Sequence, residues 1–192
     1  MKNIVYITLL LFAFTVQAQQ QNDDCQLTIE TTEEGDEIKS TKDYLMYEKV
    51  FGDTSQFLFF SLTNSAGTPL LNFQLLSKSK GFTPQVCLNQ NSRIFIQLTN
   101  NKIVTLISAV EEQCSALVYD TNEKNNLRIL TGTFLFTKGN FEDLEKSAVS
   151  FIRVQYATES VDYPIKKELT SETSGTVYQP ETYFINHLKC LE

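Results

Sequence analysis

Residues 93–107 read RIFIQLTNNKIVTLI, and this stretch predicts a β-hairpin that sets the fold class. Ile94, Ile96 and Leu98 recur at every second position, which is the period of a strand with one buried face. Asn tolerates a positive φ, so Asn100-Asn101 is expected to form a two-residue turn. Residues that pair across this turn carry numbers that sum to 201. The expected shared apolar face consists of Ile94, Ile96, Leu98, Ile103 and Ile107.

The four cysteines fit the same register. Cys87 and Cys114 also sum to 201, so they face one another if the hairpin continues without a net bulge. Four cysteines allow three connectivities, and the register favours Cys87–Cys114 with Cys25–Cys190. The second pair would tie the first strand to the last helix and contribute on the order of 4–5 kcal/mol in a chain-entropy model. In this register Cys87 falls at a hydrogen-bonded position, where the geometry suits a disulfide less well.

Alternating or apolar runs predict further strands on both sides of the hairpin. They cover residues 25–30, 38–50, 56–62, 71–75, 127–136 and 151–156. The run 56–62 is apolar on both faces, so we expect a central strand that is covered on each side. The turn signal at 64–69 favours an antiparallel return. Residues 170–177 are expected to form a polar loop.

Two helices are expected beside these strands. A short one covers 141–147, where Asn140 precedes two acidic residues. A closing helix begins at Pro180 and places Phe184, Leu188 and Leu191 on one face. The expected fold class is α+β and mainly antiparallel β: a curved sheet or partly closed barrel with one or two packed helices, including a C-terminal helix.

Residues 1–18 read MKNIVYITLLLFAFTVQA and have the order of a secretory signal peptide. Lys2 precedes an apolar run that ends near Val16, and the small Ala18 provides a cleavage site. The run is too short for a stable membrane span, and no later run reaches that length, so no stable membrane insertion is expected after cleavage. Residues 19–192 are expected to form a single β-rich domain that is periplasmic or secreted, where conditions favour disulfides.

The formal net charge of −7 argues against nucleic acid as a partner. The Lys and Arg residues are scattered and outnumbered, so they form no basic footprint for phosphates. No CxxC motif or Cys/His cluster indicates a metal site, and no motif indicates a cofactor. The partner is therefore expected to be an unknown protein or small molecule.

Two side chains are candidates for a catalytic, metal-binding or ligand-binding role. His187 is the only histidine and is expected to be a half-buried helix residue with no catalytic or metal role. No Gly-x-Ser-x-Gly motif accompanies it, and no residue is assigned as catalytic. Arg153 shares a strand face with Phe151, so its stem is expected to pack and its guanidinium to pair with a carboxylate. Contact of Arg153 with an acidic ligand is the minority interpretation.

Several stretches resemble a group of uncharacterised exported proteins from Bacteroidota. They are the signal ending in Gln-Ala-Gln, the early Cys25, the charged segment 35–42, and Asn140-Phe-Glu-Asp-Leu-Glu-Lys followed by Ile152-Arg153-Val154. The resemblance implies an exported location and a β-rich architecture. It implies no activity.

The scarcity of catalytic residue types favours an exported non-catalytic binding or interaction module. The alternative is a carrier of a small apolar ligand, with a pocket between sheet and helix. A hydrolase without a recognisable motif is the third interpretation of the function. A filled interior would favour the module, whereas an open apolar cavity of several hundred Å³ would favour the carrier.

Overall fold

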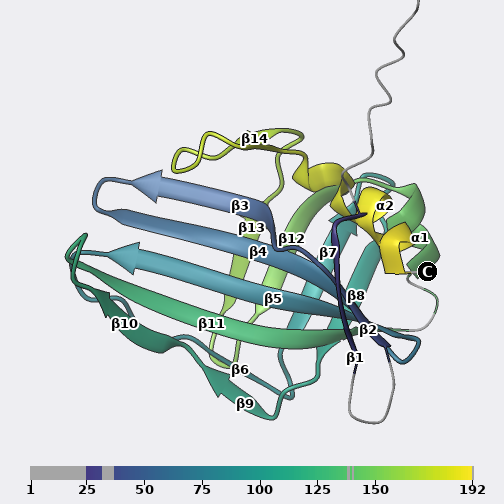
Figure 1. The fold of residues 1–192 in the computed structure, drawn as a ribbon, viewed down its shortest axis with the longest axis horizontal. Coiled ribbons are helices and arrows are strands. Elements are labelled where there is room, and N and C mark those ends of the chain that lie inside the picture. The colour runs from purple at the N-terminus through teal and green to yellow at the C-terminus, as the bar shows by residue number, and fades with distance from the viewer. Residues whose placement is uncertain (1–24, 32–36, 138, 140, 192) are drawn as a thin grey trace, which may run out of the picture.

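The computed structural model of the chain describes residues 25–31, 37–137, 139 and 141–191. The expected signal peptide, residues 1–18, lies outside the described residues. An 11-stranded antiparallel sheet dominates the fold (Figure 1). The sheet is curved but is not closed into a barrel. Of the two expected forms, a curved sheet and a partly closed barrel, the curved sheet is the one observed.

The strands of the main sheet are β1 (Leu27–Thr31), β2 (Glu37–Thr41), β3 (Tyr44–Phe51), β4 (Thr54–Ser65), β5 (Thr68–Ser79), β7 (Arg93–Leu98), β8 (Ile103–Ser108), β10 (Ala116–Asp120), β11 (Asn125–Phe136), β12 (Val149–Gln155) and β13 (Ser160–Pro164). Two small antiparallel pairs lie beside it: β6 (Cys87–Asn89) with β9 (Glu112–Cys114), and β14 (Leu169–Thr170) with β15 (Val177–Tyr178).

Three long strands, β4, β5 and β11, form the middle of the sheet. β4 pairs with β5 along its whole length, and β5 pairs in turn with β11. On its other edge β4 pairs first with β3 and then, beyond Phe60, with β2. β11 likewise pairs first with β10 and then with β8. β4 and β11 therefore change neighbours along their length, and the curved sheet continues from them in different directions at its two ends (Figure 1).

The core lies between these long strands and the group β7, β8, β12 and β13, which crosses behind them in Figure 1. Phe73 of β5 meets Tyr156, which follows β12, with ring centroids 6.2 Å apart. Tyr47 of β3 meets Tyr163 of β13 at 5.2 Å. The buried Tyr156 and Tyr163 hydroxyls lie 2.7 Å apart and satisfy one another. Burial raises the pKa of both phenols, that of Tyr163 to about 12.

The C-terminal segment covers one end of the core as three short helical pieces instead of the single helix expected from Pro180. They are the 3₁₀ helix η2 (Pro180–Thr182), the helix α2 (Tyr183–His187) and the 3₁₀ helix η3 (Leu188–Leu191). The expected apolar face is present, since Phe184, Leu188 and Leu191 are all buried. The other helix, α1 (Phe141–Lys146), packs against α2 and ends one residue before the expected limit.

The expected hairpin forms, but the register expected for it is wrong by one residue. Ile94 lies opposite Leu106, so paired numbers sum to 200. The turn holds three residues, because the N–H of Leu98 bonds to the carbonyl of Lys102 at 2.9 Å. Asn101 takes the left-handed conformation with φ of 67°, which is the geometry of a three-residue hairpin loop. The left-handed Asn therefore closes a longer turn than the one expected.

This shift changes which residues of the second strand are buried. The first strand keeps its expected face of Ile94, Ile96 and Leu98. In the second strand Val104 and Leu106 are buried, whereas Ile103 is 62% exposed and Ile107 is half-buried. The expectation that Ile103 and Ile107 are core residues is therefore wrong.

One strand was expected over residues 38–50. The structure has two strands there, β2 and β3, which are separated at Lys42-Asp43. β10 and β13 were not expected at all. The segment 170–177 was expected to be a loop, but its ends form the β14–β15 pair.

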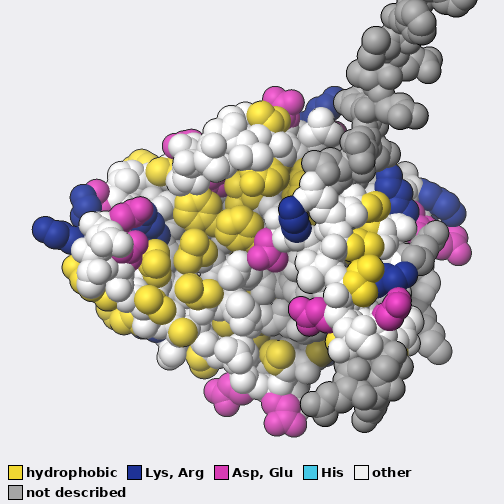
Figure 2. Space-filling view, viewed as in Figure 1, with side chains coloured by type: hydrophobic (Ala, Val, Ile, Leu, Met, Phe, Trp, Pro, Cys, Tyr) yellow, Lys and Arg dark blue, Asp and Glu magenta, His cyan; other side chains and the backbone are white. Residues whose placement is uncertain are grey.

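The central strand β4 is covered on both faces, but unequally. Its inner face, with Phe60, lies in the main core, while Phe57 on the outer face packs with Leu45 and with Leu169 of β14. The β14–β15 pair therefore covers part of the outer face. Figure 2 views this face, and hydrophobic side chains gather there over the long strands. The outer face of the sheet is thus only partly buried.

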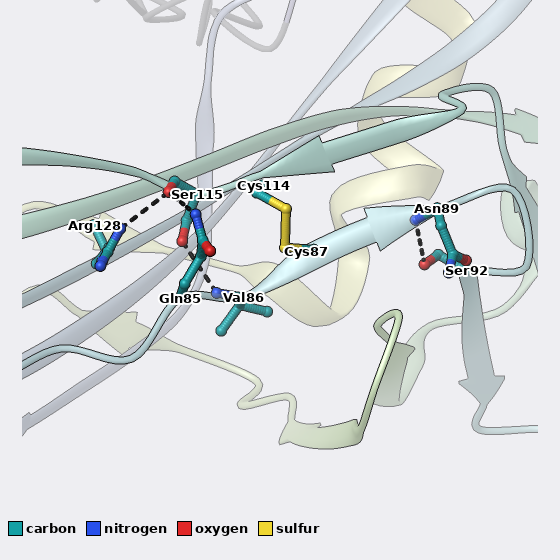
Figure 3. Close-up of a disulfide and its surroundings, with 8 residues drawn as sticks. All are labelled: Gln85, Val86, Cys87, Asn89, Ser92, Cys114, Ser115 and Arg128. Carbon is teal, nitrogen blue, oxygen red and sulfur yellow. Dashed lines mark hydrogen bonds between the residues drawn. A yellow bond between two sulfur atoms is a disulfide. The ribbon is translucent and has the colours of Figure 1, made fainter.

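The two disulfides join the pairs that the sequence analysis favours, Cys25 with Cys190 and Cys87 with Cys114. Between the last paired residues of the two ladders, the returning chain holds four residues, 108–111, and the outgoing chain holds three, 90–92. The extra residue restores the sum of 201 at Cys87–Cys114, the disulfide drawn in Figure 3. The N–H of Ser115 bonds to the carbonyl of Val86 at 2.8 Å, so the adjacent cysteine pair is non-hydrogen-bonded. The expected conflict between register and disulfide geometry is therefore absent.

Candidate functional site

A cleft of about 570 Å³ lies where the β2–β3 junction, the β15 segment and helix α2 meet. It is built from segments that are far apart in the sequence. Its lining residues are Gln26, Thr41, Lys42, Asp43, Tyr44, Thr176, Val177, Tyr178, Gln179, Asn186 and His187. We call this space the Tyr44 cleft.

Tyr44 holds the walls of the cleft together. Its hydroxyl accepts a hydrogen bond from the backbone N–H of Gln179 at 2.7 Å. Its ring meets the rings of Tyr178 and His187 at 5.1 and 5.0 Å, both edge-on. One side chain at the start of β3 therefore contacts both the β15 segment and helix α2. Aromatic pairs of this geometry stabilise by about 0.5–1.5 kcal/mol beyond their buried area.

Thr41 fixes the position of the β2–β3 junction. Its hydroxyl oxygen accepts a hydrogen bond from the N–H of Leu62 in β4 at 2.9 Å. The next residue, Lys42, donates from its ammonium group to the side-chain oxygen of Gln26. These bonds place a charged dipeptide, Lys42-Asp43, at the cleft. Within the described part of the chain, neither of these charges has an ion-pair partner.

His187 is more buried than expected, since only 8% of it is exposed. Its Nδ1 lies 2.7 Å from the carbonyl oxygen of Tyr183, so Nδ1 carries the proton and donates. The imidazole stacks on the Tyr183 ring at 4.6 Å. The sequence analysis placed His187 on the closing helix but did not foresee that it lines a cleft.

The β14–β15 wall is attached to the sheet by a buried carboxylate. Oε1 of Glu48 accepts from the backbone N–H of Glu172 at 3.2 Å, and Oε2 is buried with no hydrogen-bond partner among the described residues. Leu169 of β14 packs into the apolar cluster of the outer face nearby. A buried carboxylate needs such contacts, because its transfer from water is costly.

The Cys25–Cys190 disulfide closes the same end of the molecule. Cys25 immediately precedes Gln26 of the cleft, and Cys190 lies one turn after Asn186. The Cα atoms of the two cysteines are 5.4 Å apart. The disulfide therefore links the two chain segments that contribute Gln26 and α2 to the cleft.

Asp43 also lines a second hollow of about 350 Å³ on the sheet. The other polar side chains of this hollow are neutral: Asn72, Gln74, Gln113, Thr131 and Thr133. Asp43 is thus the residue that the Tyr44 cleft and this hollow share.

Arg153 lies away from the Tyr44 cleft and pairs with a carboxylate, as expected. Its Nε and Nη2 donate to the two oxygens of Asp162 at 2.6 and 2.8 Å. These hydrogen bonds raise the pKa of Arg153 and lower that of Asp162. The side chain is 52% exposed, so its stem is less packed than expected. It lines a shallow hollow of about 320 Å³ with Phe95 and Phe151, and its contact with a ligand stays a prediction.

The described residues contain no group of three or more His, Cys, Asp or Glu side chains placed to hold a metal ion. None of their helices has the length and apolar character needed to cross a membrane. Comparison with known proteins adds no family: no family model, no curated protein and no solved structure matches this sequence.

Proposed function

We propose that the protein is an exported, non-catalytic binding module that takes a small polar ligand in the Tyr44 cleft. The observation that carries this proposal is the construction of the cleft. Its volume of about 570 Å³ falls in the range of small-molecule sites, which is about 300–1,000 Å³. Four separate chain segments meet there, and Tyr44 and the Cys25–Cys190 disulfide hold them in place.

The lining indicates the chemistry of the ligand. Amide and hydroxyl side chains predominate among its polar groups, and these can both donate and accept hydrogen bonds. Lys42 and Asp43 carry opposite charges, so the cleft has no strong preference for one sign. Tyr44 and Tyr178 add flat apolar surface. A small, polar ligand with little net charge and one flat side, such as a sugar ring, matches this lining.

The two other interpretations have less support. Between the sheet and helix α2, the described side chains of Phe60, Tyr183, Phe184 and Leu188 are each fully buried, which favours a filled interior over a carrier pocket. A hydrolase of the Ser-His-Asp type would have to use His187, and no serine is among the residues that line the Tyr44 cleft with it. Both observations favour the binding module.

Export is part of this proposal. The signal-like residues 1–18 support it, and so do the two disulfides, which persist mainly in oxidising compartments. Mass spectrometry of the protein from its native host should find a mature N-terminus at Gln19. Recovery of an intact Met1 end from the cell envelope would contradict export by signal cleavage.

Binding can be tested with mono- and disaccharides and free amino acids, each at 10 mM. We expect saccharides to raise the melting temperature, and calorimetry then gives the dissociation constant. The double variant Lys42→Ala/Gln179→Ala removes two polar groups of the cleft and should weaken binding about fivefold or more, because each hydrogen bond contributes about 0.5–1.5 kcal/mol.

The matched control is Lys80→Ala/Gln97→Ala, which changes the same residue types outside the cleft. It should bind like the wild type. If no compound of the panel binds, or if both double variants bind equally well, the cleft is not the site of a small polar ligand.

A further inference from the structure

Strand β10 is an edge strand without the usual protection. It pairs with β11 on one side, and no strand in the described ranges pairs with its other side. Leu117, Val118 and Tyr119 are 52%, 47% and 55% exposed. The strand holds no Pro and no Lys, and its ladder with β11 has no bulge. These are the devices by which proteins normally prevent edge strands from pairing with other chains.

The other edges of the sheet are better protected. β13 carries Asp162 and ends in Pro164, which lacks the N–H that a partner strand would need. β1 carries the charged Glu30 within the strand. The one acid of β10, Asp120, is its last residue, and its carboxylate accepts from the N–H groups of Asn122 and Glu123 in the following turn. The edge of β3 lies against β15, and Tyr44 at its start is bonded to Gln179. Among the described edges, β10 is therefore the one best suited to accept a strand.

We propose that two copies of this chain associate by antiparallel pairing of their β10 strands, with the two-fold axis at Val118. In this register Val118 faces itself, Leu117 faces Tyr119, and Ala116 faces Asp120. Every large apolar side chain of β10 then meets another one. The single charge of the strand meets alanine at the border of the contact, so no like charges are opposed.

Neighbouring registers are poorer. A two-fold axis at Tyr119 would place Asp120 opposite Val118, and an axis at Asp120 would place the two carboxylates opposite one another. An axis at Leu117 would place Tyr119 opposite the polar Ser115. The side-chain sequence of β10 therefore complements itself best in one register, as a contact between identical patches requires.

The outer face of the sheet continues into this contact. Val118 pairs with Leu127 of β11, and the adjacent Ile129 pairs with Leu76 of β5, which reaches the apolar cluster around Phe57. Paired residues of a sheet lie on the same face. The apolar surface seen in Figure 2 would thus run without interruption from one copy to the other.

The association should be weak. Five-residue strands paired edge to edge bury less than the roughly 1,200–2,000 Å² of a standard stable interface. Each copy also carries a formal charge of −7, so the copies repel one another at low ionic strength. Because the contact itself is apolar, added NaCl should strengthen the dimer and not weaken it.

Sedimentation velocity of the purified, disulfide-intact protein tests this at concentrations from 10 µM to 1 mM. The wild type should show a reversible monomer–dimer equilibrium that shifts toward dimer in 0.5 M NaCl. Val118→Lys should raise the dissociation constant at least tenfold. The matched control is Ile103→Lys, which changes an apolar residue of β8 that is more exposed than Val118, 62% against 47%, and should dimerise like the wild type.

Cross-linking tests the register. Val118→Cys should form a covalent dimer under mild oxidation, because opposed residues in an antiparallel pair lie within disulfide range. Leu117→Cys and Tyr119→Cys should each cross-link poorly alone but efficiently when mixed, whereas Ile103→Cys should stay monomeric. A wild type that is monomeric at 1 mM, equal association of the two lysine variants, or cross-linking of Ile103→Cys as efficient as that of Val118→Cys would overturn the proposal.

Discussion

The two disulfides should differ in how much they stabilise the fold. A disulfide restricts the unfolded chain, and in the chain-entropy model the effect grows with the logarithm of the loop it closes. Cys25–Cys190 spans 165 residues and Cys87–Cys114 spans 27. The model gives about 5 kcal/mol for the longer loop and about 3.5 kcal/mol for the shorter one. Loss of the longer loop should therefore cost about 1.5 kcal/mol more.

The comparison needs two double variants, Cys25→Ala/Cys190→Ala and Cys87→Ala/Cys114→Ala, so that no free thiol remains in either. Guanidinium unfolding at 25 °C, followed by circular dichroism, gives the free energy of unfolding of each. Similar slopes with denaturant would show that both unfold as comparable two-state systems. If the Cys87/Cys114 variant lost as much stability as the other, or more, loop closure would not be the dominant effect.

Three further predictions concern the core. Gly132→Ala should lower the free energy of unfolding by about 1–3 kcal/mol in denaturant titrations, because the added Cβ would overlap the buried Leu88. The control Gly81→Ala should be nearly neutral in the same titrations, because its Cβ would meet no close neighbour. The pKa of Tyr163 is raised to about 12 from 10.0, so the folded state holds this proton more tightly. The contribution of Tyr163 to the free energy of unfolding should be complete below pH 10 and be lost between pH 10 and 12, and Tyr163→Phe should reduce that slope in unfolding measured against pH. His187→Gln should keep the far-ultraviolet spectrum and lower the free energy of unfolding by about 1 kcal/mol; a loss above about 3 kcal/mol would assign the imidazole a larger structural role.

The hairpin shows how far periodicity can predict a register. In the first strand the apolar face of Ile94, Ile96 and Leu98 was placed correctly. The opposite face mixes Phe95 with the polar Arg93 and Gln97, so the choice between the two faces was clear. In the second strand Ile103 and Ile107 compete with Val104 and Leu106, and both faces read as apolar. The sequence of that strand therefore does not distinguish a two-residue turn from a three-residue turn. The cysteine pairing was still correct, because the extra residue before β9 offsets the longer turn.

Strand boundaries were harder to predict than strand existence. The break at Lys42-Asp43 is set by β4, which exchanges its partner β3 for β2 at that point, and no local signal marks it. β10 has exposed apolar side chains on both faces, so it lacks the alternation of a half-buried strand.

The Tyr44 cleft could not be predicted from local sequence. Its residues come from four segments, and only the tertiary fold brings them together. The sequence analysis identified His187 and the Cys25–Cys190 pair, which lie at the cleft, but without Tyr44 it had no reason to connect them. The richness in tyrosine of the segments around 44 and 178–183 was the available signal.

The nested arrangement of the disulfides has a consequence for how the protein matures. A chain emerges from its N-terminus, so Cys25 appears first, Cys87 second, Cys114 third and Cys190 last. Oxidation of cysteines in order of appearance would join Cys25 to Cys87, a bond that is absent from the native fold. Native pairing thus requires either that Cys25 stays reduced until the chain is complete or that the first bond is exchanged. Where oxidation follows the order of synthesis, the yield of native protein should therefore depend on disulfide isomerisation and not only on oxidation.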